Sequence, residues 1–208
     1  MSGGAIPNKG SMTRAFVGVP INLPENHKGN LKGWLWGDYS NQNRELKEVD
    51  AGLTYSRNID QVKGLSADAT AAIWHYPNDD FDNNYIGEIG VNYSKQLGEK
   101  VSLDNRVAVT QLMSHGDTGS GTQMWAKMGL PITLHKGADL ELTLTPEISA
   151  AKLKGWYGST GTSHVTPGLN LGGSYKGVDF NAFVKKQDGK HESTETRTYS
   201  GVSIGHKF

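Results

Sequence analysis

The last twelve residues, Arg197–Phe208 (Arg-Thr-Tyr-Ser-Gly-Val-Ser-Ile-Gly-His-Lys-Phe), decide the fold that the sequence predicts. In an extended chain, Val202, Ile204 and Phe208 fall on one side, and mostly small or polar residues fall on the other. Alternation with a period of two residues is typical of a strand with one apolar and one polar face. An unpaired strand at this position would leave an adhesive edge, so we expect it to pair with a neighbouring strand.

This closing strand resembles the last strand of bacterial outer-membrane β-barrel proteins, which typically end in phenylalanine. The resemblance covers the last twelve residues closely and the rest of the chain by pattern. It implies an all-β fold, a closed antiparallel up-and-down transmembrane β-barrel located in the bacterial outer membrane and in contact with membrane lipid. It also implies that the barrel assembly machinery recognises the C-terminal strand.

The composition agrees with a barrel and excludes several other classes of protein. Only 36% of the 208 residues are hydrophobic, and 27 are glycine, whereas a barrel in lipid needs only every second strand residue to be apolar. Lys+Arg and Asp+Glu both number 21, so no basic surface predicts a nucleic-acid partner. The absence of cysteine excludes disulfides and thiolate metal sites, and we expect no cofactor. The first residues lack the pattern of a signal peptide, which predicts a mature form carrying an added Met.

Period-two alternation recurs along the chain in eleven segments of about 9–13 residues, the length that crosses a bilayer when tilted. Short and long connections alternate in the second half. The short ones are Gly98–Lys100, His135–Ala138 and Lys176–Gly177, and the long ones are Ser114–Gly121, Leu153–His164 and Lys186–Glu195. Short turns on one side and long loops on the other are typical of outer-membrane barrels.

Bacterial single-chain barrels have an even number of strands, whereas this pattern gives an odd number. Either residues 1–12 form a weak first strand, or they thread the lumen, or one of the eleven segments is not a separate strand. We expect about twelve strands, with ten as the alternative. The predicted organisation is an irregular or weakly patterned segment, residues 1–12, followed by a single barrel domain, residues 13–208. A soluble sandwich or lipocalin-like barrel would show the same alternation.

Charged residues recur on the face opposite the apolar one. A Lys or Arg in mid-bilayer costs about 2–4 kcal/mol, so these charges should point inward. The residues predicted to line a pore are Glu48, Asp50, Asp68, Glu88, Asp104, Arg106, Lys127, Glu141, Glu147, Asp179 and Lys185. Eight acids against three bases predict a mildly cation-preferring channel for passive diffusion of small hydrophilic solutes, without enzyme activity. The alternative is that these charges pair and plug the interior.

Two other functions remain open. Outer-membrane barrels include lipases, lipid A deacylases and proteases, whose catalysis needs a histidine beside a serine or an acid at the barrel rim. The candidates are His75, His115 with Asp117, and His164 beside Ser163, although no Gly-x-Ser-x-Gly motif is present. The first alternative function is therefore a barrel hydrolase with a rim active site. The second is a non-conducting structural or adhesion barrel.

An acidic segment between two predicted strands is a candidate calcium site, because Asp79, Asp80 and Asp82 offer the hard oxygen ligands that Ca²⁺ prefers. Their spacing is not that of an EF-hand, and acidic surface loops are usually only solvated. We therefore predict no metal site.

Tryptophan and tyrosine near strand ends predict interfacial aromatic girdles, in which amphipathic rings lie at the headgroup level. The tryptophans are Trp34, Trp36, Trp74, Trp125 and Trp156. Trp156 lies in a predicted loop and is also a candidate contact for surface polysaccharide.

Overall fold

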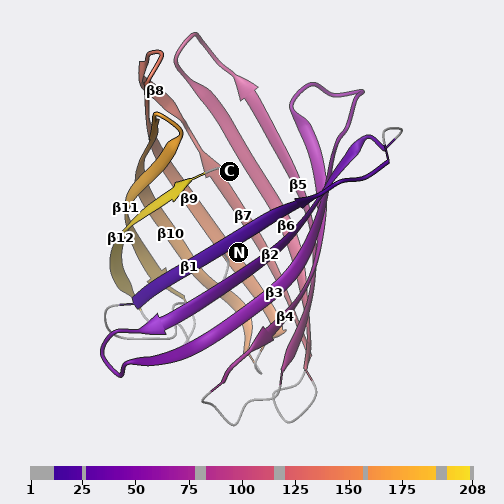
Figure 1. The fold of residues 1–208 in the computed structure, drawn as a ribbon. Coiled ribbons are helices and arrows are strands. Elements are labelled where there is room, and N and C mark those ends of the chain that lie inside the picture. Colours follow the sequence, from indigo (N-terminus) through magenta and orange to yellow (C-terminus); the bar gives the residue numbers. More distant parts are fainter. Residues whose placement is uncertain are drawn as a thin grey trace. The chain divides into compact units, whose positions relative to one another are not determined.

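The computed structural model of the chain describes residues 12–24, 27–77, 83–114, 120–156, 159–190 and 196–206. All the regular elements in these ranges are β-strands (Figure 1). They are β1 (Met12–Ile21), β2 (Gly29–Ser40), β3 (Glu45–Asn58), β4 (Leu65–His75), β5 (Asn84–Gln96), β6 (Ser102–Ser114), β7 (Gly121–Gly129), β8 (Ile132–Lys136), β9 (Leu140–Trp156), β10 (Ser159–Tyr175), β11 (Val178–Gly189) and β12 (Arg197–His206). No helix in the described ranges is long and apolar enough to span a membrane.

The twelve strands form an antiparallel up-and-down sheet in chain order, from β1 to β12, with β8 off this path and paired with β9. Pro131 explains why β8 is separate. The sequence predicts one continuous strand through this position, but proline has no N–H group for the ladder. The Pro131 carbonyl still accepts a hydrogen bond from the Ser102 N–H, at 3.0 Å. The interruption divides the predicted strand into β7 and β8.

The expected number of about twelve strands is confirmed, but for a different reason from the one predicted. The sequence suggested a twelfth strand within residues 1–12. In the described residues the additional strand is β8 instead, and residues 1–11 lie outside the described part of the chain.

Contacts divide the chain into two compact units. Unit 1 comprises Met1–Val91, Ala108–Met124 and Leu153–Thr160, and unit 2 comprises Asn92–Val107, Trp125–Lys152 and Gly161–Phe208.

Unit 1 has one exposed apolar face and one polar face. The ladder places Val17 opposite Leu35, and both side chains are exposed. One residue further along β2, Trp36 lies opposite Asp50 on the other face, where Asp50 is buried. The predicted alternation is confirmed in these strands. An exposed row of large apolar side chains is the surface that lipid covers in a membrane barrel.

Two tryptophans, Trp156 of unit 1 and Trp125 of unit 2, lie elsewhere than the sequence predicts. Trp156 ends β9 and is buried in a small core with four other apolar residues, Ala72, Ile86, Leu112 and Leu153, against which Trp34 and Trp74 pack. In unit 2, Trp125 is also buried. The girdle prediction is therefore wrong for Trp125 and Trp156, and the predicted loop position of Trp156 is wrong. Large indole rings gain most free energy when other apolar side chains cover them.

The closing strand of unit 2 shows the predicted alternation most clearly. Val202 and Ile204 are 82% and 81% exposed, and they lie opposite Ala182 and Phe180 of β11. Their face of β12 is thus apolar and open, as the sequence predicts. Phe208, the closing residue of the predicted motif, lies outside the described residues.

Two connections are shorter than predicted. The segment Leu153–His164 is not a long loop, because β9 extends to Trp156 and β10 begins at Ser159. Strand β11 likewise continues to Gly189, into the predicted loop Lys186–Glu195. These strand ends are polar and rich in glycine, so they show no alternation of apolar and polar residues. The backbone of any residue except proline can still donate a hydrogen bond to a neighbouring strand.

Candidate functional site

Four of the predicted pore-lining residues, Glu48, Asp50, Asp68 and Glu88, belong to unit 1. Glu48 and Asp50 lie on one face of β3, with Glu48 opposite Asp38 in the ladder. Asp68 lies further along the sheet, on β4 opposite Ser56. Glu88 accepts a hydrogen bond from Thr110 Oγ1 at 2.7 Å. The structure thus brings Glu48 and Asp50 together and leaves the other two in separate surroundings.

The seven others belong to unit 2: Asp104, Arg106, Lys127, Glu141, Glu147, Asp179 and Lys185. The main cluster here is centred on Glu147. Its carboxylate accepts hydrogen bonds from Lys127 Nζ at 2.6 Å and from Lys185 Nζ at 2.5 Å. Its side chain is only 5% exposed, so this acid is almost fully enclosed by its two bases.

Two further charges of unit 2 also have specific partners. Asp104 accepts a hydrogen bond from Ser94 Oγ at 2.6 Å. Arg106 donates to Asn92 Oδ1 at 2.9 Å and lies over the Trp125 ring, 5.1 Å from its centroid. Such pairing is what the plugged-interior alternative expects, and it reduces the charge that a passing ion would meet. The pore-lining role of the eleven residues stays a prediction.

The histidine candidates differ in their surroundings. His75 is exposed, and its Nδ1 lies 2.7 Å from Asn83 Oδ1. His115 and Asp117 lie outside the described residues. His164 is buried, and its Nδ1 lies 3.0 Å from Ser163 Oγ. Of the described histidines flagged from the sequence, His164 therefore has the arrangement of a base beside a hydroxyl nucleophile.

The β10–β11 ladder positions this pair opposite the end of β11. His164 lies opposite Gly189, the last residue of β11. Thr166 and Gln187, each two residues further into the sheet on the same two strands, are buried as well. Successive residues of one face alternate along a strand, so Thr166 and Gln187 share the face of His164. They add two buried polar residues to this face, which sequence reasoning missed because single threonines and glutamines carry no distinctive spacing.

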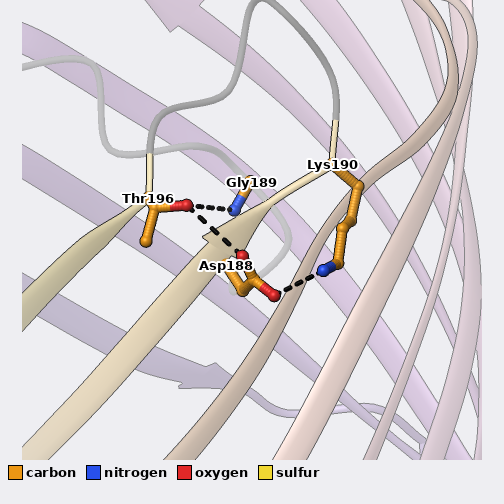
Figure 2. A network of polar contacts seen from close by, with 4 residues as sticks. All are labelled: Asp188, Gly189, Lys190 and Thr196. Atoms are coloured by element: carbon orange, nitrogen blue, oxygen red, sulfur yellow. Dashed lines mark hydrogen bonds and ion pairs between the residues drawn. The ribbon is translucent and has the colours of Figure 1, made fainter.

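Figure 2 shows a network of polar contacts that holds the adjoining end of β11 against the start of β12. Asp188 accepts hydrogen bonds from Lys190 Nζ at 2.5 Å and from Thr196 Oγ1 at 3.3 Å. The Gly189 N–H donates to Thr196 Oγ1 at 3.2 Å. The network reaches the histidine pair through the backbone, because the Lys190 N–H donates to the Ser163 carbonyl at 2.8 Å.

These contacts define the candidate site as the Ser163–His164 pair with the network that positions it. A serine hydroxyl at hydrogen-bonding distance from a neutral imidazole nitrogen can transfer its proton as it attacks a carbonyl carbon. The described residues hold no group of three or more His, Cys, Asp or Glu side chains arranged for a metal ion. The three aspartates of the candidate calcium segment, Asp79, Asp80 and Asp82, lie outside the described residues.

Comparisons with known proteins show the fold. No family model matches the chain, and no curated protein matches it in sequence. Among solved structures, the chain is similar to LpxR from Salmonella typhimurium, an outer-membrane β-barrel protein, with 12% sequence identity and a TM-score of 0.58. The similarity covers 94% of this chain and 88% of LpxR. At the level of the fold, this likeness confirms the predicted β-barrel class, and it supports the predicted localisation in the bacterial outer membrane.

Proposed function

We propose that this protein is an outer-membrane β-barrel hydrolase with its active site at the Ser163–His164 pair. The observation that carries the proposal is the 3.0 Å contact between Ser163 Oγ and His164 Nδ1. The likeness to LpxR favours this alternative over a passive channel. The substrate class that suits a serine nucleophile with a histidine base is a carboxylic ester.

The reaction follows from the atoms of the pair. Ser163 Oγ attacks the ester carbonyl carbon while its proton passes to His164 Nδ1. The protonated imidazole then returns that proton to the departing alcohol, which leaves an acyl-serine. Water, deprotonated by the same nitrogen, hydrolyses the acyl group and restores the serine.

Burial of the pair predicts the kinetics. Ser163 and His164 are 2% and 3% exposed, so an ester can reach them only after covering side chains move. Motions of this kind occur on microsecond to millisecond or slower timescales and often limit turnover. We therefore expect slow hydrolysis, limited by the movement that exposes the pair.

Hydrolysis of p-nitrophenyl butyrate by the full chain, refolded in detergent, tests the proposal. Ser163→Ala should lower the rate by about 10²–10⁴-fold, and His164→Gln by a similar factor, because each removes one half of the proton transfer. Ser174→Ala, on the same strand but near its other end, is the matched control. An inactive parent protein, or full activity in Ser163→Ala, would refute the proposal.

The passive channel is tested on the same preparation by conductance in planar lipid bilayers. Steady single-channel steps without ester hydrolysis would favour the channel. In that case, replacement of Glu88 and Asp104 by amides should reduce the cation preference, measured as a reversal potential in a salt gradient. Absence of both channel conductance and ester hydrolysis would favour a structural or adhesion barrel.

A further inference from the structure

A second polar cluster lies on the polar face of unit 1, away from the histidine pair. Its centre is Asp50, which is 1% exposed. In the ladders, Asp50 lies opposite Trp36 of β2 on one side and opposite Trp74 of β4 on the other. Directly opposite residues on one face have Cβ atoms about 4.5–5.5 Å apart. The carboxylate is thus flanked by two indole side chains.

Negative charge exceeds positive charge around Asp50. Asp38 and Glu48 lie opposite each other in the same ladder, two residues along each strand from Trp36 and Asp50 and therefore on the same face. Among residues 12–24 and the other described ranges, the cation of this cluster is Arg14, whose Nη2 lies 3.5 Å from Asp38 Oδ2 and whose guanidinium carbon lies 5.8 Å from the Trp36 ring centroid. Three carboxylates and one guanidinium leave an excess of acid in a place that water barely reaches. A buried charge in such surroundings requires a partner.

Several buried polar atoms of this cluster accept or donate no hydrogen bond within the described part of the chain. The acceptors are Asp38 Oδ1 and both carboxylate oxygens of Asp50, and the donor is Trp74 Nε1. Native proteins rarely leave such atoms unsatisfied, and each exception needs an explanation such as a ligand. These three acceptors and one donor lie on adjacent strands. A ligand that fits them must carry hydrogen-bond donors for the three oxygens and an acceptor for the indole N–H.

We propose that this cluster binds the primary ammonium group of a small organic cation. An ammonium offers three N–H donors, which matches the three unsatisfied oxygens of Asp38 and Asp50. Tryptophan faces attract cations, and cages of aromatic side chains bind alkylated ammonium groups. Trp74 Nε1 would donate to an oxygen atom carried next to the amine. The ligand class is therefore an amino alcohol or a related hydroxylated amine.

A shared proton is the competing explanation. The carboxyl groups of Glu48 and Asp50 are placed to hydrogen-bond to each other when one of them carries a proton, and that shared proton would also relieve the excess of negative charge. That arrangement would leave no need for a ligand. The two explanations differ in what they predict for an added amine, since only the ligand site gives saturable binding.

Ethanolamine is a suitable probe because it is an ammonium ion with an adjacent hydroxyl. Binding to the refolded full chain in detergent at pH 7 would be followed by tryptophan fluorescence and by calorimetry, with ethylene glycol as the uncharged comparison. We expect saturable binding of ethanolamine and none of ethylene glycol. Asp50→Asn should weaken binding at least tenfold, because it removes the charge and keeps the shape of the side chain. Asp68→Asn, which changes another buried acid of unit 1, should leave it unchanged.

A second variant keeps the test decisive if Asp50→Asn fails to fold. Trp74→Phe retains an aromatic face and removes the Nε1–H group, so it should weaken ethanolamine binding more than ethylamine binding. Absence of saturable amine binding to the parent protein would overturn the proposal in favour of the shared proton. Equal binding by Asp50→Asn would overturn it by placing the bound amine away from Asp50. Equal binding of ethylene glycol would overturn the assignment of a cation site.

Discussion

Glu147→Gln is the substitution that tests the unit 2 charge cluster most directly. The change keeps the size of the side chain but leaves two ammonium groups, Lys127 and Lys185, without their carboxylate. Lys185 is 21% exposed, and a hydrogen bond to a charged group is worth about 1.5–3 kcal/mol. Lys127 is 37% exposed, so solvent screening limits its contribution to about 0.2–1 kcal/mol. We therefore expect the free energy of unfolding to fall by about 2–4 kcal/mol.

The measurement is reversible urea unfolding of the refolded full chain in phospholipid vesicles, followed by tryptophan fluorescence. Glu141→Gln changes an exposed acid on the same strand and should shift the free energy of unfolding by less than about 0.5 kcal/mol. Replacement of Lys127, Glu147 and Lys185 together by methionine should recover most of the loss, because no buried charge is then left without a partner. A Glu147→Gln protein as stable as the parent would refute the view that this cluster contributes to stability.

Two further substitutions and one deletion test the packing, the lipid face and the closing motif. Gly52→Ala should destabilise the protein by about 1–3 kcal/mol in the urea assay, because an added Cβ would lie 2.4 Å from the Trp34 ring. Val202→Arg should cost about 2–4 kcal/mol in vesicles if this face meets mid-bilayer lipid, whereas Ser203→Arg on the opposite face should cost less. Deletion of Phe208 should impair membrane insertion in cells and leave refolding in detergent nearly normal, and equal insertion with and without it would contradict the assembly role of the closing strand.

Alternation in the sequence was sufficient to predict most strands and their two faces. Val202 and Ile204 illustrate why, since lipid or a core must cover every second side chain of an amphipathic strand. The prediction failed where both faces are polar or small. Around Gly155, whose φ is +67°, the chain looks like a loop in sequence, yet β9 continues to Trp156. Backbone pairing, which carries no side-chain signature, maintains the strand there.

The two candidate sites differ in how much the sequence disclosed. Ser163 and His164 are neighbours in the chain, so their proximity was predictable, although their 3.0 Å contact was not. Only part of the cluster around Asp50 was predicted from the sequence. Glu48 and Asp50 were among the predicted pore-lining residues, whereas Arg14 and Asp38 were not. The alternation of β2 was ambiguous in sequence, since either face of Leu31–Tyr39 could be the apolar one.

The sequence by itself determined that this protein is built from amphipathic strands with an apolar face suited to lipid, because that property belongs to each strand separately. Only the tertiary structure decided which charges meet. Glu147 lies between Lys127 and Lys185, and Asp50 between Trp36 and Trp74, although each set is distant in sequence. The physical reason is strand register. A shift of one residue would move every side chain of a strand to the opposite face, and pairing between strands sets this register.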